Sequence, residues 1–382
     1  MQKYWKIIIS TGAVLFPGLL SATNGDHLIG IGSKARGMGG TGIGLYHGAE
    51  SALANAALIT NVKDAELFVS VTACMPDVKT SIGGGYVSSD ADFSPIPEVA
   101  YVEHAKEHLY WGIGMFGTAG MGVDYRDAPA NMQMMTRLQL MQFALPVAYR
   151  EGAFSIGVTP IIQYGSLNIR YSGNTLPGKS DDFGTGYQAG ISYRAKGWSV
   201  GLVYKSAIDM KYDGQLSGAM EDFSGMPGFS DRLEQPYEAG SGISYRAGAH
   251  TVALDYKLIG WGSAKGYNAF GWKDQNVYAL GYEYNSGLWA ARIGYNHAKS
   301  PIRDQGSSGG LTNTLNLLGF PAIIENHYTV GFSKDVDETT TVDFALTYAA
   351  EAKASYAGMF PGQNVSTKHR QRAVTLGVAH RF

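Results

Sequence analysis

The sequence predicts an all-β fold: a 14-stranded antiparallel transmembrane β-barrel with an N-terminal hatch (plug) inside the lumen. Three observations predict it. Charged residues make up only 16% of the 382 residues, whereas 51 are Gly and 24 are Tyr; globular domains contain about 25% charged residues and about 7% Gly. From residue 65 onward, runs of alternating apolar and small or polar residues recur between turns. The last run ends in an aromatic residue, Phe382.

The N-terminus has the pattern of a signal peptide. Lys3 and Lys6 precede IIISTGAVLFPGLLSA, an uncharged stretch of sixteen residues that ends in small residues. A basic region, a short apolar core and small residues at the cleavage site are typical of export signals, and the stretch is short for a membrane helix. We therefore expect residues 1–22 to be a signal peptide, 23–64 the hatch and 65–382 the barrel.

The repeated runs have a period of two residues. In NVYALGYEYN, Tyr278, Leu280 and Tyr282 share one face, and small or polar residues occupy the other. This alternation indicates strands with one apolar face. Short turns alternate with long connections, as in outer-membrane barrels. The expected strands are residues 66–75, 97–105, 108–117, 135–150, 153–171, 184–195, 198–212, 236–247, 249–261, 275–286, 288–299, 325–335, 339–352 and 369–382.

A soluble β-sandwich would also alternate, but its apolar faces would pack against each other as an inner core. Here the second face is rich in Gly, Ala, Ser and Thr and carries scattered charges, which favours a polar lumen and a lipid-facing exterior. The closing run AVTLGVAHRF ends in Phe382 and is similar to the terminal strand by which bacterial outer-membrane barrels are recognised for assembly.

Composition also limits the chemistry. A net charge of -2 gives no reason to expect a nucleic-acid partner. One cysteine, Cys74, allows neither an intrachain disulfide nor a cysteine metal cluster, and the nine histidines show no HExxH spacing. We expect no cofactor and no metal. No Ser/His/acid set suggests an enzyme.

The stretch ARGMGGTGIGL contains the spacing Gly37-x-Gly39-x-x-Gly42, which also occurs in dinucleotide-binding loops. That fingerprint requires a buried strand before it, a helix after it and an acidic residue about twenty positions later. The surrounding sequence lies close to the predicted cleavage site and lacks this context. Fourteen strands leave a wide lumen. The glycines are therefore expected to serve tight turns and close approach to the wall within a plug.

Several segments, taken in order, resemble the FadL/TodX family of outer-membrane transporters of long-chain fatty acids and other hydrophobic compounds. They cover nearly the whole chain after residue 22. In ANAALITN, Asn55 and Ala57 match the family's Asn-Pro-Ala segment, with Ala56 in place of Pro. The matching segments are NGDHLIGIGSKARGMGGTGIG, ANAALITN, QPYEAGSGISYR, YKLIGWGSAK, WKDQNVYALGYEYNSGLWAARIGYNHAKSPI and RQRAVTLGVAHRF.

The resemblance implies passive uptake: loops capture the substrate, a lumen pocket binds it, the hatch moves, and the substrate leaves sideways at an inward kink of the third strand. Asn55 and Ala57 would then belong to the gate. In LYWGIGMFGTAGMGVDY, Gly117, Gly120 and Gly122 interrupt the alternation where the family bends. Glycine within a strand marks bulges and bends.

Candidate substrate-binding residues lie in two loops and on two strands. Met132 and Met135 belong to a methionine-rich connection, and Phe223 and Phe229 lie in the loop 213–235; methionine adapts to varied apolar ligands. Arg170 matches the arginine that the family places near a fatty-acid head group. The family's partner lysine has no match. Arg292 faces the lumen and either replaces that lysine or pairs with Glu283.

These departures leave the substrate open. Long-chain fatty acids are the first hypothesis, and aromatic or alkane hydrocarbons the second. A structural or adhesive barrel with a permanent plug is the alternative of another class. In every case we expect a monomer in the bacterial outer membrane, in contact with lipid and lipopolysaccharide and inserted by the barrel assembly machinery.

Overall fold

The computed structural model describes residues 23–173, 178–224 and 229–382, apart from the side chains of residues 223 and 224. The predicted signal peptide and the Phe223 side chain therefore lie outside the described part. Among the described residues, no helix combines the length and the apolar character needed to cross a membrane.

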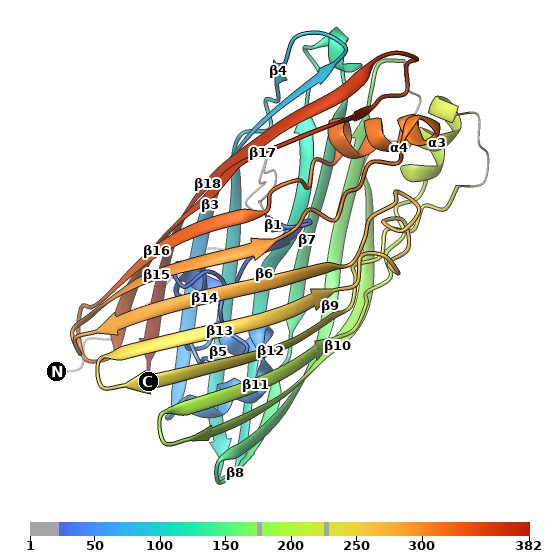
Figure 1. Cartoon of the computed structure of the whole chain (residues 1–382). Coiled ribbons are helices and arrows are strands. Elements are labelled where there is room, and N and C mark those ends of the chain that lie inside the picture. Colours follow the sequence, from blue (N-terminus) through green and yellow to red (C-terminus); the bar gives the residue numbers. More distant parts are fainter. Residues whose placement is uncertain (1–22, 174–177, 225–228) are drawn as a thin grey trace, which may run out of the picture.

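The described strands close into an antiparallel barrel, in which β18 pairs with β3 (Figure 1). β7 and β8 form one wall strand interrupted at Leu145 and Pro146, and fourteen wall strands result, as predicted. The wall consists of β3 (Ala65–Ile82), β5 (Ser94–Lys106), β6 (Leu109–Asp124), β7 (Met135–Ala144) with β8 (Val147–Glu151), β9 (Phe154–Arg170), β10 (Ser180–Ala195), β11 (Trp198–Lys205), β12 (Glu238–Ala247), β13 (His250–Ile259), β14 (Gln275–Asn285), β15 (Trp289–Ala298), β16 (Asn326–Asp335), β17 (Thr340–Ala357) and β18 (Asn364–Arg381).

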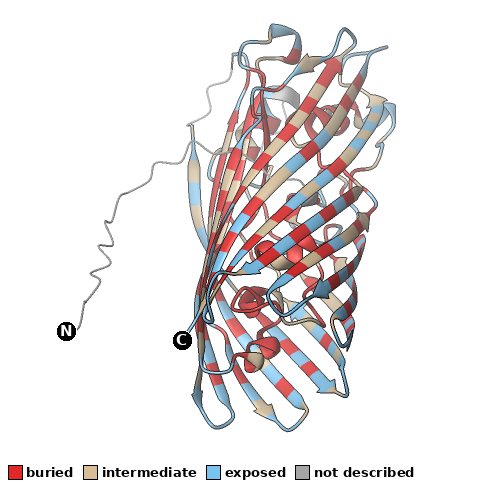
Figure 2. Ribbon diagram, turned by 90° about the vertical axis from the view of Figure 1, so that its left-hand side faces the viewer, coloured by how far each residue is buried: buried red, intermediate tan, exposed pale blue. Residues whose placement is uncertain are grey.

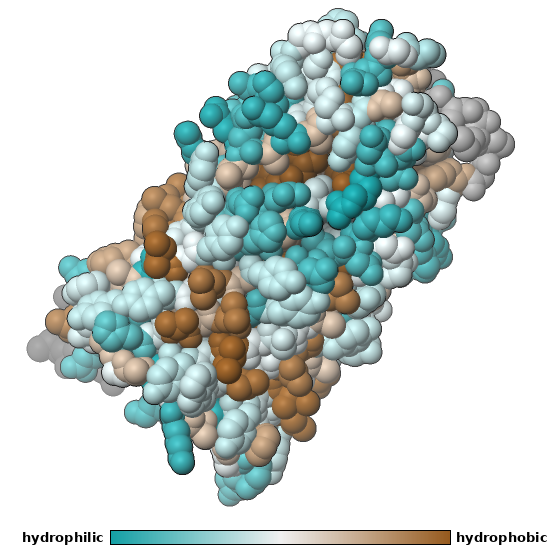
Figure 3. Space-filling view, viewed as in Figure 1, coloured by the Kyte–Doolittle hydropathy of each residue, from teal (hydrophilic) through white to brown (hydrophobic). Residues whose placement is uncertain are grey.

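Side chains alternate between the two faces of the wall. On β14, Leu280 is 49% exposed, whereas its neighbour Ala279 is 4% exposed. Figure 2 shows this banding on strand after strand. Figure 3 shows hydrophobic residues gathered in clusters over the wall in the lower half of the view. The large apolar side chains therefore point outward, as lipid contact requires.

Several strands, β3 and β18 among them, are longer than the sequence predicted. β3 and β18 pair as far as Ile82 and Val365, beyond the expected limits of 75 and 369. On this extension the outward positions of β3 include Asp77 and Lys79, so the apolar alternation stops while the ladder continues. Arg370 on β18 binds Asp77 across the pair, with an Nη2–Oδ2 distance of 2.6 Å. The paired strands β3 and β18 therefore extend beyond the part of the wall that faces lipid.

β11 is shorter than predicted, since it ends at Lys205 rather than at residue 212. Residues 206–212 turn into the lumen, where Ile208 and Met210 are fully buried. They lie against the wall at Gly184, where an added Cβ would come within 2.6 Å of both side chains. The alternation persists in this segment, but its apolar face packs inside the barrel.

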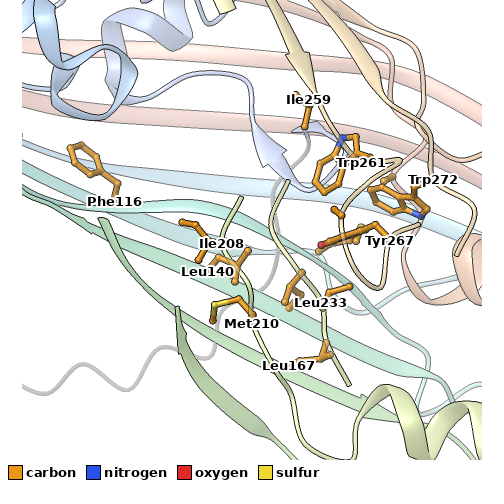
Figure 4. Packing of buried hydrophobic residues seen from close by; sticks show 14 of the residues in the cluster. Phe116, Leu140, Leu167, Ile208, Met210, Leu233, Ile259, Trp261, Tyr267 and Trp272 are labelled. Atoms are coloured by element: carbon orange, nitrogen blue, oxygen red, sulfur yellow. The ribbon is translucent and has the colours of Figure 1, made fainter. Parts of the chain in front are cut away.

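Long connections fill the upper lumen with apolar side chains. They carry η2 (Pro129–Asn131), α3 (Leu216–Ser224), η3 (Ser307–Gly309), α4 (Gly310–Thr314) and η4 (Leu315–Gly319), and β4 (Val87–Ser88) is a short strand in the β3–β5 connection. The residues labelled in Figure 4 form what we call the apolar cluster: Phe116, Leu140, Leu167, Ile208, Met210, Leu233, Ile259, Trp261, Tyr267 and Trp272. The rings of Trp261, Tyr267 and Trp272 lie 4.7–5.0 Å apart.

Residues 23–64, the hatch, lie inside the barrel (Figure 1). The hatch comprises β1 (Thr23–Asn24), β2 (His27–Leu28), α1 (Gly32–Gly37), α2 (Ser51–Ala54) and η1 (Ala56–Asn61). Gly39 and Gly40 have φ angles of 69° and 88°, so glycine serves the turns as predicted.

Glycines of the wall allow the hatch backbone to approach the wall closely. A Cβ at Gly201 would collide with the carbonyl oxygen of Ile43, and one at Gly294 with the amide nitrogen of Gly39. Three pairs of these glycines are register partners on neighbouring strands. We call the six the glycine seat: Gly157 with Gly190, Gly201 with Gly242, and Gly281 with Gly294. The glycine excess thus allows backbone to approach backbone.

Adding a methyl group to the glycine seat should loosen the hatch. In Gly201→Ala and Gly294→Ala the new Cβ overlaps hatch backbone, and overpacking of this kind costs about 1–3 kcal/mol. We expect limited proteolysis to cut the hatch faster, while circular dichroism of the barrel stays unchanged. Gly84→Ala is the control because nothing lies within 4 Å of a Cβ there. Equal protection of all three variants would contradict the close fit.

Candidate functional site

A buried ion pair fixes α1 to the wall. Arg36 places its Nη2 2.7 Å from Glu98 Oε1 and its Nη1 3.0 Å from Oε2. Glu98 also accepts hydrogen bonds from the Ser70 hydroxyl at 2.7 Å and from the Gly32 N–H at 3.2 Å. Both carboxylate oxygens are therefore satisfied, which a buried charge requires.

A second carboxylate holds the glycine-rich loop. Asp255 on β13 accepts the N–H groups of Gly42 and Ile43 through one oxygen, at 2.7 and 2.8 Å. Successive backbone N–H groups that converge in this way form an anion-binding concavity. The loop that resembles a dinucleotide motif thus binds an anion, and this anion is a side chain of the barrel itself.

The Asn55–Ala57 segment forms a third anchor. The Asn55 side chain accepts the Ala57 N–H at 3.1 Å and donates to the Ile43 carbonyl at 2.9 Å. The Ala56 N–H donates to Gln188 Oε1 on β10 at 3.0 Å. A proline at position 56 would lack this N–H, so the Ala adds a contact to the wall. The gating role of Asn55 and Ala57 stays a prediction.

The wall is incomplete between β5 and β6. Their ladder ends at the pair Glu98–Phe116, although β5 begins at Ser94 and β6 continues to Asp124. Pro95 and Pro97 have no N–H to offer β6. Farther along β6, Asp124 hydrogen-bonds to Ser89 and Asp90, which belong to the connection between β4 and β5. We call the region between residues 94–97 and 117–123 the wall gap.

The predicted kink glycines lie at this gap. The β6–β7 register shifts between Gly117 and Ala119, which leaves Thr118 as the extra residue of a bulge. Gly120 donates its N–H to the Asp26 carbonyl at 3.1 Å, so the hatch supplies a partner that β5 does not. Gly122 has a φ of 158°.

A pocket of about 200 Å³ occupies the wall gap, and a cavity of about 90 Å³ lies between hatch and wall. Leu28 of β2 lines both, and it is the residue they share. Thr118 lines the inner cavity, while its neighbours Gly117 and Ala119 line the outer pocket. Leu28 of the hatch and Thr118 of the wall thus lie where the inner cavity and the pocket in the wall gap come closest.

Two of the predicted binding residues, Met132 and Phe229, pack against the apolar core of the upper lumen, and the Phe229 ring lies 5.7 Å from that of Phe270. Met135 is buried, but the alternation of β7 places it on the outer face of the wall, opposite Arg170. The two arginines are not brought together. Arg170 is exposed at the end of β9, and Arg292 is buried among the short turns at the opposite end.

Arg292 pairs with Glu283, with an Nε–Oε2 distance of 2.7 Å, and lines a polar vestibule of about 580 Å³. Of the two roles considered for Arg292, the structure therefore supports the ion pair with Glu283.

Sequence reasoning missed Leu28, Lys205, Glu238 and Lys257, which line the inner cavity. The alternation of TVALDYKLIG does place Lys257 on the lumen face, but nothing in the sequence ranks it above other lumen charges. Leu28 carries no signal, because its importance depends on where the hatch meets the bulge.

His47 serves the internal structure of the hatch. His47 Nε2 lies 2.7 Å from the Thr41 carbonyl, and burial lowers the pKa of His47 to about 3, so the ring is neutral at pH 7. Among the described residues, no group of three or more His, Cys, Asp or Glu side chains could hold a metal ion.

A closed barrel with a lipid-facing exterior, stoppered by its own N-terminal segment, defines a plugged outer-membrane barrel. Residues 29–249 match the family model described as "Outer membrane protein transport protein (OMPP1/FadL/TodX)". This match spans more than half of the chain. The chain belongs to this family of bacterial outer-membrane transport proteins.

Solved structures share the fold at low sequence identity. The toluene transporter TodX of P. putida is 16% identical, with a TM-score of 0.70, and the match covers 92% of this chain and 99% of that one. A FadL homologue of Pseudomonas aeruginosa is 14% identical, with a TM-score of 0.71 and coverage of 94% and 100%. The toluene transporter TbuX of Ralstonia pickettii is 17% identical, with a TM-score of 0.65 and coverage of 92% and 98%. No curated protein sequence matches the chain.

Removing one partner of the Arg36–Glu98 pair should release the hatch. Arg36→Met leaves a buried carboxylate without its cation, which costs about 3–5 kcal/mol. We expect a higher conductance in planar bilayers, and partial recovery in Arg36→Met/Glu98→Gln, where no charge is left. Arg126→Met is the control because its pair with Asp124 is more exposed and such pairs contribute about 0–1 kcal/mol. If Arg36→Met conducts like the unmodified protein, this pair does not hold the hatch.

Proposed function

We propose that the protein is a passive, non-enzymatic channel for the uptake of hydrophobic small molecules, long-chain fatty acids among them, across the outer membrane. The position of Leu28 carries the proposal. This side chain lines the cavity inside the lumen and the pocket in the wall gap. Its displacement would join the two and open a path from the lumen into the bilayer.

Capture would take place in the upper lumen. Met132 and Phe229 pack against the buried apolar core of the lumen, where flexible thioethers and aromatic rings suit varied apolar ligands. An apolar molecule gains roughly 25 cal/mol for each Å² of apolar surface removed from water. Binding there needs no energy source.

Exit would follow a movement of the hatch near β2. The contact of this strand with β6 is small: His27 pairs with Ala119, and Gly120 donates to the Asp26 carbonyl. Moving Leu28 would break few hydrogen bonds to the wall strand β6. By contrast, the route straight down leads to the polar vestibule around Arg292. Lateral exit through the wall gap keeps an apolar substrate out of that polar space.

The identity of the substrate is the finer part of the proposal. The similar structures include proteins titled toluene transporter, FadL homologue and monoaromatic hydrocarbon channel. These names support hydrophobic compounds as a group. Aromatic or alkane hydrocarbons are the alternative to fatty acids, by the same route.

A disulfide across the wall gap should block uptake. A Cβ added at Gly117 would lie 3.7 Å from the Ile96 Cβ, and disulfides need a separation of about 3.8 Å. We therefore expect Ile96→Cys/Gly117→Cys, built on Cys74→Ser, to close the gap on oxidation. Uptake of labelled oleate and toluene should fall to the level of cells that lack the protein, and reduction should restore it.

Ser355→Cys/Ser366→Cys provides the matched control. These hydroxyls lie 2.7 Å apart across an intact part of the β17–β18 ladder, so a disulfide there closes no gap. Unchanged uptake by the oxidised Ile96→Cys/Gly117→Cys variant would rule out lateral exit. If neither oleate nor toluene enters faster through the unmodified protein than without it, the barrel is a permanently plugged structural one.

A further inference from the structure

A cluster of charges forms one side of the inner cavity. Lys205 on β11 and Lys257 on β13 flank Glu238 on the intervening strand β12. The Lys257 Nζ lies 2.8 Å from Glu238 Oε2, and the Lys205 Nζ lies 3.4 Å from Oε1. The side chain of Lys257 is 24% exposed, that of Lys205 13% and that of Glu238 11%, so water reaches them poorly. Two cations thus share one carboxylate in a shielded place.

Both ammonium groups have N–H donors beyond the one that each directs to Glu238. Each has three N–H donors, and among the described residues Glu238 is the hydrogen-bond partner of both. His27 faces the same carboxylate, with its Nδ1 3.5 Å from Oε1. A second acceptor in the cavity could therefore bind both lysines without displacing Glu238.

Two further carboxylates lie nearby, but each has its own partners. Asp26 is hydrogen-bonded to Tyr267 and Gln235. Asp255 binds the hatch N–H groups of Gly42 and Ile43. The structure thus assigns these two anions to the hatch and its neighbours, and leaves the lysines with Glu238.

The same cavity also has aliphatic lining residues beside polar ones such as Gln188 and Asn296. Leu28 and Ile31 contribute from the hatch, and Val203 and Val277 from the wall. A space lined by two cations and by aliphatic side chains matches a molecule with a charged head and an apolar tail. A hydrocarbon would fill the apolar side and leave the lysine donors unused.

We propose that Lys205 and Lys257 bind the carboxylate head group of a hydrophobic monocarboxylate, whose tail extends past Leu28 toward the wall gap. Glu238 bridges the two lysines and neutralises part of their charge when the site is empty. This inference rests on the proposed uptake function and names its substrate class. It also moves the head-group site away from Arg170, which is exposed at the end of β9.

The size of the cavity couples binding at the lysines to movement of Leu28. At about 90 Å³ it is smaller than the cavity of about 150 Å³ that holds benzene in an engineered protein. It admits a head group and the start of a chain. A longer tail needs the space beyond Leu28, so binding at the lysines and displacement of Leu28 would occur together.

Oleate and oleyl alcohol test the proposal, because they share a tail and differ in the head. In the purified full chain, Lys205→Met/Lys257→Met should weaken oleate binding about tenfold or more, equivalent to about 1.4 kcal/mol, and change oleyl alcohol binding less than about twofold. Methionine keeps an unbranched side chain, one atom shorter than that of lysine, and removes the charge. The control is Lys353→Met/Lys368→Met, a pair of register partners near the β17–β18 turn, outside the lumen.

Two more variants keep the test decisive. Glu238→Gln should strengthen oleate binding, since it removes the competing carboxylate and keeps both lysines. Arg170→Met should leave the preference for oleate over oleyl alcohol intact. The proposal is overturned if Arg170→Met abolishes that preference while the double lysine variant retains it, or if the double variant weakens both ligands equally.

Failure of this inference is distinguishable from failure of the proposed function. If oxidised Ile96→Cys/Gly117→Cys blocks uptake but the double lysine variant binds oleate normally, lateral exit is supported and the head-group site at the lysines is rejected. If the disulfide has no effect on uptake, the lateral route falls, whatever the lysine variants bind.

Discussion

The approach of hatch backbone to wall backbone is the contact on which the rest of this structure depends. Backbone N–H and C=O groups inside a membrane barrel need partners, and a hatch with little regular structure has many to satisfy. The wall supplies them with Asp255, Gln188 and Glu98. The glycine seat lets the hatch lie close to the strands that carry Asp255 and Gln188.

The hatch is held unevenly around its circumference. On the glycine seat, from β9 to β15, it lies against backbone. At β5 and β6 the wall itself is open, and β2 covers the gap with few contacts. Glu98 stands at the boundary, because it is the last residue of β5 to pair with β6 and also the partner of Arg36. The Glu98 carboxylate therefore holds the hatch at the point where the β5–β6 ladder ends and the wall gap begins.

How far the sequence predicts this structure depends on the environment that each residue contacts. Lipid contact imposes a period of two, so the fourteen strands could be predicted. The end of β3 could not, because Asp77 and Lys79 continue a ladder outside the lipid, nor could the end of β11, because Ile208 and Met210 continue the alternation inside the lumen. Lys205 and Lys257 meet only through the register of β11, β12 and β13, which no local pattern encodes.

The Gly37–Gly42 motif shows why chemistry and function must be argued separately. Glycines at this spacing let consecutive N–H groups converge on an anion, in a dinucleotide site as well as here. Which anion they bind is decided by what the fold places opposite. A strand-to-helix turn leaves the N–H groups open to a phosphate, whereas this barrel presents Asp255 from β13. The same local physics therefore binds a ligand in one fold and fastens a hatch in the other.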